Sequence, residues 1–235
     1  MKVCIIPARG GSKRIPRKNI KEFCGKPMIA YSIDAAINSC CFERIIVSTD
    51  DPEIADISRK YGAETPFTRP EEISDDYTGT TAVIAHAIEW LHQHNEMPKQ
   101  ACCIYATAPF ISYVDIEKGQ KILDETSCDY AFSVTSYAFP IQRAISISEN
   151  KRVEMFQPEY LSVRSQDLKE AYHDAGQFYW GKAESWRLGK PIFSQEATPI
   201  ILPRYRVQDI DTPEDWERAE LMFKVLQMGG MDNAQ

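Results

Sequence analysis

Short apolar segments alternate with amphipathic segments of helical period through most of this chain of 235 residues. Lys2–Pro7 and Arg44–Thr49 have the length and apolar content of buried strands. Pro27–Ser39 and Thr80–Gln93 carry apolar residues at the spacing of a helix face. Because strands that alternate with helices pair in parallel, the pattern predicts a three-layer α/β/α sandwich around a mostly parallel, twisted sheet. The other expected elements here are a helix that Asp51 caps, Pro52 starts and Gly62 ends, strands at 101–107 and 129–137, and a helix at 114–125.

The alternation stops between Ala138 and Asp174, where short mixed patches and two prolines replace it. We expect an antiparallel insertion or arm at 138–174, within a single domain that spans residues 1–235. The α/β pattern then returns with the segments GQFYWG and ATPIILP and an amphipathic helix, PEDWERAELMFKVLQM. The last residues, 229–235, are expected to form a frayed tail.

Composition and charge narrow the class of protein. The net charge of −7 argues against nucleic-acid binding, and no apolar run is long enough to span a membrane. The first residues lack a signal-peptide pattern, so we expect a cytoplasmic protein. Four of the seven cysteines lie inside apolar runs and are expected to be buried, reduced thiols: Cys4, Cys102, Cys103 and Cys128.

A basic, glycine-containing loop, IIPARGGSKRIPRKN, follows the first expected strand. Its glycines, Gly10 and Gly11, let backbone N–H groups approach an anion, and it fits neither the Walker A pattern nor the dinucleotide fingerprint. Arg9 can form a forked contact with phosphate, and Lys13 and Lys18 supply further charge. Ligands of open α/β sheets bind where parallel strands end, so a phosphate site is favoured over a solvated basic loop.

A pair of carboxylates, Asp209 and Asp211, lies in the segment VQDIDTPEDW. In an extended chain, residues two apart point to one side, so both carboxylates are placed to hold Mg²⁺. The alternative is helix capping, because Thr212 and Asp215 form a capping-box pattern that Asp211 could assist. Capping leaves Asp209 without a role, which favours the metal site.

These motifs together resemble the cytidylyltransferases that activate acidic sugars, such as the CMP-sialic acid and CMP-Kdo synthetases. The segments that carry the resemblance are IIPARGGSKRIPRKN, GKPMIAYSIDAA, RIIVSTDD, TRPEEISDD, YATAP, AYHDAGQFYW and QDIDTPEDW, so it covers almost the whole chain. Within this family, the pseudaminic acid cytidylyltransferase group is the most similar. The resemblance implies a nucleotide-diphospho-sugar transferase fold and transfer of CMP from CTP to an acidic nine-carbon sugar, pseudaminic acid, with release of pyrophosphate. N-acetylneuraminate, legionaminate and Kdo are the alternative sugars, and a non-catalytic nucleotide-binding protein is a more distant alternative.

The resemblance also assigns residues. It implies catalytic roles for the basic loop and the carboxylate pair, with Mg²⁺ as the cofactor: Arg9, Lys13, Lys18, Asp209 and Asp211. For Thr80, one of the nucleotide-binding residues that the resemblance implies, capping of a helix is an equally good explanation. The nucleotide-binding residues that it implies are Ala8, Arg9, Gly10, Gly11, Ser12, Lys13, Asn19, Arg69 and Thr80.

On the sugar side, Tyr105 stands where similar sialic acid enzymes carry glutamine, which favours a different acidic sugar. Arg164 is the expected clamp on the sugar carboxylate, because a guanidinium and a carboxylate pair in a planar, bidentate way. For His173 and Asp174, a hydrogen bond that stabilises the fold is the alternative. In the family, the insertion reaches a second subunit and completes its sugar pocket, so we expect a homodimer. The sugar-binding residues implied are Tyr105, Arg164, His173, Asp174, Gln177 and Tyr179.

Overall fold

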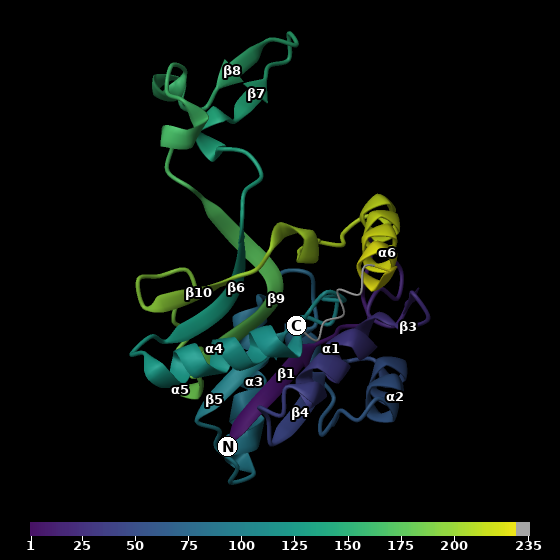
Figure 1. Ribbon diagram of the computed structural model, residues 1–235. Helices are drawn as coiled ribbons and strands as arrows, with labels where there is room; N and C mark the ends of the chain where they lie inside the picture. The colour runs from purple at the N-terminus through teal and green to yellow at the C-terminus, as the bar shows by residue number, and fades with distance from the viewer. Residues whose placement is uncertain (229–235) are drawn as a thin grey trace.

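A six-stranded sheet forms the centre of the protein in this computed structural model, which describes residues 1–228 (Figure 1). The expected tail, 229–235, lies outside the described residues. From one edge of the sheet to the other, the strands are β10 (Ala197–Ile201), β6 (Tyr130–Ser136), β9 (Tyr172–Lys182), β5 (Gln100–Ile104), β1 (Lys2–Pro7) and β4 (Arg44–Ser48).

The sheet is mostly parallel, as predicted. β1 pairs in parallel with β4 and β5, and β10 pairs in parallel with β6. β9 is the exception, because it runs antiparallel between β5 and β6. The first residues of β9 therefore lie at the same edge of the sheet as the last residues of its neighbours.

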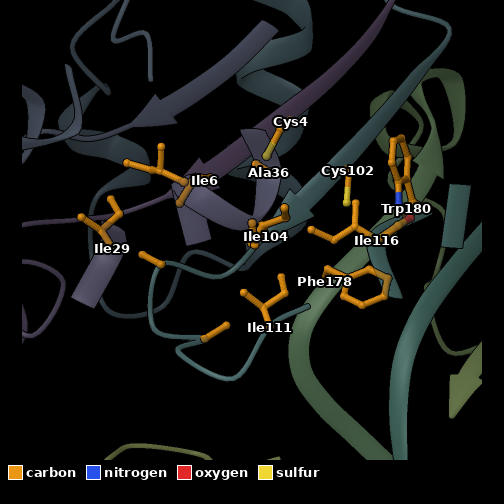
Figure 2. Close-up of a cluster of buried hydrophobic side chains, with 14 of the residues drawn as sticks. Cys4, Ile6, Ile29, Ala36, Cys102, Ile104, Ile111, Ile116, Phe178 and Trp180 are labelled. Carbon is orange, nitrogen blue, oxygen red and sulfur yellow. Dashed lines mark hydrogen bonds between the residues drawn. The ribbon is translucent and has the colours of Figure 1, made fainter. Parts of the chain in front are cut away.

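Helices cover both faces of the sheet and confirm the three-layer sandwich. In β1, Cys4 and Ile6 face the cluster that includes side chains of α1 and α4 (Figure 2), whereas Val3 and Ile5 face the side chains of α3 and α5. Both sets are fully buried, because successive residues of a strand point to opposite faces. The helices are α1 (Met28–Asn38), α2 (Pro52–Lys60), α3 (Thr80–Gln93), α4 (Tyr113–Glu125), α5 (Ala183–Arg187) and α6 (Pro213–Met228).

Helix α6 packs outside the sandwich, near a small antiparallel ribbon of β2 (Glu22–Phe23) and β3 (Lys26–Pro27). Phe23 and Trp216 form an edge-to-face pair there, with ring centroids 5.5 Å apart. This contact ties the β2–β3 ribbon, which follows the basic loop, to the start of α6.

An arm projects from the sandwich between β6 and β9 (Figure 1). It contains the antiparallel hairpin of β7 (Ile145–Ile147) and β8 (Val153–Met155), as the sequence predicts for this region. The expected boundary at Asp174 is wrong, however. β9 begins at Tyr172, so His173 and Asp174 belong to the main sheet, where Asp174 pairs with Val134 of β6.

Local sequence signals explain the helix ends near the site. The carboxylate of Asp51 accepts hydrogen bonds from the backbone N–H groups of Glu53 and Ile54, which confirms it as the cap of α2. Gly62, just beyond this helix, has a φ of +96°, a conformation that favours glycine. All seven cysteines are free, and the four in apolar runs are buried, as expected. In the described part of the chain, no helix is long and apolar enough to cross a bilayer.

Candidate active site

The basic loop is fixed where β1 ends. The N–H of Gly10 donates to Oδ1 of Asp50 (2.9 Å), and Nδ2 of Asn19 donates to the carbonyl of Arg9 (2.9 Å). A Cβ atom on Gly10 would lie 2.7 Å from Oδ2 of Asp51, whereas one on Gly11 would meet nothing within 4 Å. Gly10 therefore allows the close approach of loop and strand end, and Gly11 leaves space above the loop.

The predicted cations of this loop converge on carboxylates. Arg9 Nη1 lies 2.5 Å from Oδ1 of Asp76, and Lys13 pairs with the other oxygen of Asp76. Hydrogen bonds from these two cations lower the pKa of Asp76, and the bond from Lys13 is the larger cause. Lys18 Nζ donates to the carbonyl of Ile210 (2.7 Å) and lies 3.3 Å from Oδ1 of Asp211. The loop thus presents positive charge to the carboxylate of Asp76 and also reaches Asp211, one of the two predicted metal ligands.

Two neighbouring cavities open at this edge of the sheet, and Tyr105 and Thr107 line both. The smaller, of about 240 Å³, adjoins the basic loop and is lined by Arg9, Arg69, Asp76 and Thr80 among others. The larger, of about 480 Å³, is lined by residues of β9 and of the segment after β10: His173, Asp174, Ala175, Gly176, Val207, Gln208 and Asp209. Tyr105 follows β5 directly, so the predicted position of YATAP at a strand end is confirmed.

Arg69 and Thr80 both lie at the smaller cavity. Arg69 is buried, its Nε donates to Oγ of Ser48 (3.1 Å), and burial lowers the pKa of its guanidinium to about 10. Thr80 does not cap α3, because Gly79 is the N-cap and no side-chain oxygen serves it. The hydroxyl of Thr80 instead lies 3.2 Å from that of Tyr105. The capping alternative for Thr80 is therefore wrong.

Side chains of β9 support the larger cavity. The hydroxyl of Tyr179 donates to Oδ2 of Asp174 (2.5 Å), and the N–H of Gly176 donates to Oδ1 (2.9 Å), so Asp174 is held in a fixed orientation. Burial, with the nearby Tyr105 and Asp174, raises the pKa of Tyr179. Gln177 and Tyr179, two of the predicted sugar residues, are buried and are not among the residues that line the cavity. Nε2 of Gln177 donates to the carbonyl of Arg206 (2.6 Å).

Arg164 is the one predicted sugar residue that lies away from the others. It is on the projecting arm, its side chain is 71% exposed, and Nε lies 2.7 Å from Oδ2 of Asp167. It is not among the residues that line the larger cavity.

The carboxylate pair after β10 has the donor set that Mg²⁺ prefers. Burial and the nearby charge of Asp211 raise the pKa of Asp209, so a cation between the two would relieve an unfavourable interaction. Arg14 Nη1 lies 2.9 Å from Oδ2 of Asp211, whose other oxygen faces Lys18, so Asp209 is the more available ligand. Among residues 1–228, no group of three His, Cys, Asp or Glu side chains could hold a metal ion. A cation held by this pair would take its other ligands from phosphate oxygens and water.

The capping alternative applies to Thr212 and Asp215 but not to Asp211. Oδ2 of Asp215 accepts from the N–H of Thr212 (2.8 Å), and the N–H of Asp215 donates to Oγ1 of Thr212 (3.2 Å). This reciprocal pair is a capping box, and Asp211 contributes only its backbone N–H to it.

Sequence reasoning missed Asp76 and Thr107. Asp76 lies in the segment ISDDYTG, where two adjacent acids after Arg69 were the available signal. Thr107 lies within the predicted strand-end segment YATAP, but a threonine there carries no distinctive pattern.

Two cations gathered on one carboxylate, beside two cavities that share Tyr105 and Thr107, suit an enzyme that brings a nucleotide against a second substrate, that is, a nucleotidyltransferase. A family model described as cytidylyltransferase matches residues 3–224, and the chain belongs to this family.

Known proteins similar to this chain include enzymes that act on acidic sugars. Over 223 residues, the chain is 46% identical to the pseudaminic acid cytidylyltransferase of Campylobacter jejuni subsp. jejuni serotype O:23/36 (strain 81-176), covering 95% of this chain and 96% of the relative. It is 32% identical to the CMP-N,N'-diacetyllegionaminic acid synthase of Legionella pneumophila, covering 96% of this chain and 97% of the relative. A solved CMP-2-keto-3-deoxy-manno-octonic acid synthetase, complexed with CTP, has the same fold, with a TM-score of 0.67 at 18% identity over 95% of this chain and 98% of that one.

Proposed function

We propose that this protein transfers CMP from CTP to pseudaminic acid and releases pyrophosphate. The observation that carries the proposal is the 46% identity, over 95% of the chain, to a curated pseudaminic acid cytidylyltransferase. The reaction joins the anomeric hydroxyl oxygen of the sugar to the α-phosphorus of CTP and breaks the bond from that phosphorus to the bridging oxygen. The hydroxyl proton leaves to solvent or a base, and the sugar's carboxylate takes no covalent part.

The basic loop and the smaller cavity are the proposed CTP site. Arg9 and Lys13 already converge on one anion, Asp76, and would exchange it for β- and γ-phosphate oxygens. The N–H of Gly10 is held by Asp50 and that of Ser12 by the carbonyl of Gly10, so the backbone donors proposed for phosphate are those of Gly11 and Lys13. Arg69 and Thr80 line the cavity for the nucleoside. In this arrangement, catalysis rests on placing the α-phosphate and neutralising the pyrophosphate that leaves.

Mg²⁺ is the proposed cofactor, held by Asp209 and Asp211. When bound, the ion supplies positive charge that draws electrons from the α-phosphate. Lys18 and Arg14 orient Asp211, and Asp209 carries its carboxylate to the edge of the larger cavity. One proposed ligand thus lies at the proposed sugar cavity, and the other contacts the basic loop.

The larger cavity is the proposed sugar site, and its composition supports a homodimer. The lining residues include two carboxylates, Asp174 and Asp209, but no lysine or arginine. An acidic sugar needs a cation there, and Arg164, exposed on the arm, is available to a second subunit. We therefore propose that each arm brings Arg164 to the larger cavity of a partner. Both substrates are water-soluble metabolites, and we place the reaction in the cytoplasm.

Pyrophosphate release, measured with each nucleotide and sugar, tests the function. We expect turnover with CTP and pseudaminic acid, and at least tenfold lower kcat/KM with legionaminic acid, N-acetylneuraminic acid or Kdo. UTP should be poor, because a site built for cytosine leaves polar groups unpaired on uracil. Preference for another acidic sugar would change the substrate, and nucleotide binding without release would favour a non-catalytic protein.

A further inference from the structure

A buried ion pair joins α4 to the segment that carries the predicted metal ligands. Arg206 Nη1 lies 2.6 Å from Oδ2 of Asp115, and their side chains are only 17% and 4% exposed. Asp115 lies in the first turn of α4, and Arg206 lies between β10 and α6. Neither residue lines either cavity, so neither touches the proposed substrates.

Arg206 is held through its backbone as well. Its carbonyl accepts the hydrogen bond from Nε2 of Gln177, a β9 side chain that is 3% exposed. The side chain of Arg206 is thus fixed to a helix of one layer, and its backbone is fixed to the central sheet.

The carboxylate of Asp209 lies between this restraint and a second one. Val207, Gln208 and Asp209 follow Arg206 and line the larger cavity. Val207 also packs against the core, and a further restraint lies beyond Asp209 at Ile210, whose carbonyl accepts from Nζ of Lys18 (2.7 Å). Because three residues separate the two restraints, the position of Arg206 limits where Asp209 can lie.

The energetics of a buried ion pair favour a positioning role over a stabilising one. Removing two charges from water costs about as much as their attraction returns, and apolar residues of similar size often stabilise a fold better. What the charges of Asp115 and Arg206 add is a directional contact between α4 and the segment after β10. We propose that Asp115 and Arg206 are positioning residues that place Asp209 for Mg²⁺, which rests on the proposed function.

Metal binding by the full-length protein tests this inference. The variants are Asp115→Asn and Arg206→Lys, with Asp209→Asn as the reference for loss of a ligand. Mn²⁺ affinity is measured by electron paramagnetic resonance with CTP but no sugar, together with the Mg²⁺ concentration for half-maximal activity and Tm. We expect both positioning variants to weaken Mn²⁺ binding about tenfold and to need correspondingly more Mg²⁺, as for other residues that orient metal ligands.

Asp129→Asn is the matched control. Asp129 pairs with Lys190 (2.7 Å), and its side chain is 14% exposed. It directly precedes β6, so it lies at the opposite end of that strand from the cavities. This variant should lower Tm but keep Mn²⁺ affinity within about twofold of wild type.

The outcomes separate this inference from the proposed function. If Asp209→Asn weakens Mn²⁺ binding but both positioning variants lower only Tm, the pair is merely structural and the inference is wrong. If Asp209→Asn leaves Mn²⁺ binding unchanged, the proposed metal site fails and the inference fails with it. Arg206→Lys keeps the charge, so it decides the matter even if Asp115→Asn does not fold.

Discussion

At the scale of single residues, the basic side chains of the loop differ in their partners. Lys13 pairs with Asp76 beside the smaller cavity, whereas Lys21 lies 4.4 Å above the ring of Trp216. Lys13→Ala should therefore lower kcat/KM for CTP ten- to a hundredfold, the effect of losing a charged hydrogen bond to phosphate. Steady-state kinetics with CTP as the varied substrate measures this.

Lys21→Ala is the control for charge alone. Its cation–π contact contributes to packing rather than to the site, so kcat/KM should stay within about twofold of wild type. Equal losses in the two variants would show that the loop acts only as a diffuse positive surface.

The two adjacent glycines of the loop make a second residue-scale prediction. A methyl group on Gly10 would press against Asp51, the cap of α2, whereas one on Gly11 would meet open space. Gly10→Ala should lower Tm, because crowding of this kind typically costs about 1–3 kcal/mol of stability. Displacement of the loop should also reduce kcat/KM for CTP about tenfold. Gly11→Ala should change neither by more than about twofold. Similar behaviour of both variants would contradict this account of the loop.

Single residues were the least predictable level from sequence. The loop cations and the carboxylate pair were found because charge, glycine and spacing mark them. Asp115 and Arg206 were not found, because neither position differs in sequence from an exposed charge. Only the fold brings them together from positions far apart in the chain.

At the scale of elements, the start of α6 separates capping from metal binding. Thr212 and Asp215 bond each other at the first turn, and the side chain of Asp211 takes no part. Thr212→Ala should therefore cost about 1 kcal/mol of unfolding free energy, measured in urea, while CMP transfer is retained. Asp211→Asn should do the reverse and remove most activity with little loss of stability.

The converse pattern in these two variants would assign Asp211 to the helix and remove it from the metal site. Full activity of Asp209→Asn at saturating Mg²⁺ would likewise remove Asp209 from the metal site.

Elements were predictable from sequence where burial repeats regularly. The expected bounds of β1 and α3 match the structure, because buried strands and amphipathic helices have distinct periods. The start of β9 was missed, since His173, Asp174 and Gly176 line a cavity and break the apolar pattern of a strand. The residues that line the cavity are therefore the ones at which the sequence gives the weakest strand pattern.

At the scale of the whole molecule, the arm exposes apolar side chains that a partner would cover. Ile147 is 71% exposed and Phe156 is 68% exposed. We expect a dimer by light scattering, and a monomer when Ile147→Asp and Phe156→Asp are combined. The monomer should lose sugar turnover, because its larger cavity then lacks a cation.

Arg164→Ala is the matched control, since it should remain a dimer and still lose sugar turnover. A wild-type protein that is monomeric and active at assay concentration would exclude the proposed role of the arm.

The two ends of the arm lie side by side in the central sheet, which affects how the length of the arm can change in evolution. Residues 137–171 leave the sheet after Ser136 and return at Tyr172, and these two residues are paired neighbours. A segment whose ends already touch can lengthen, shorten or be exchanged at little entropic cost, because the strands on either side keep their register. Changes in the arm should therefore leave the register of the central sheet intact. If the arm makes the sugar and subunit contacts proposed above, one change in it would alter both at once, without changing the basic loop.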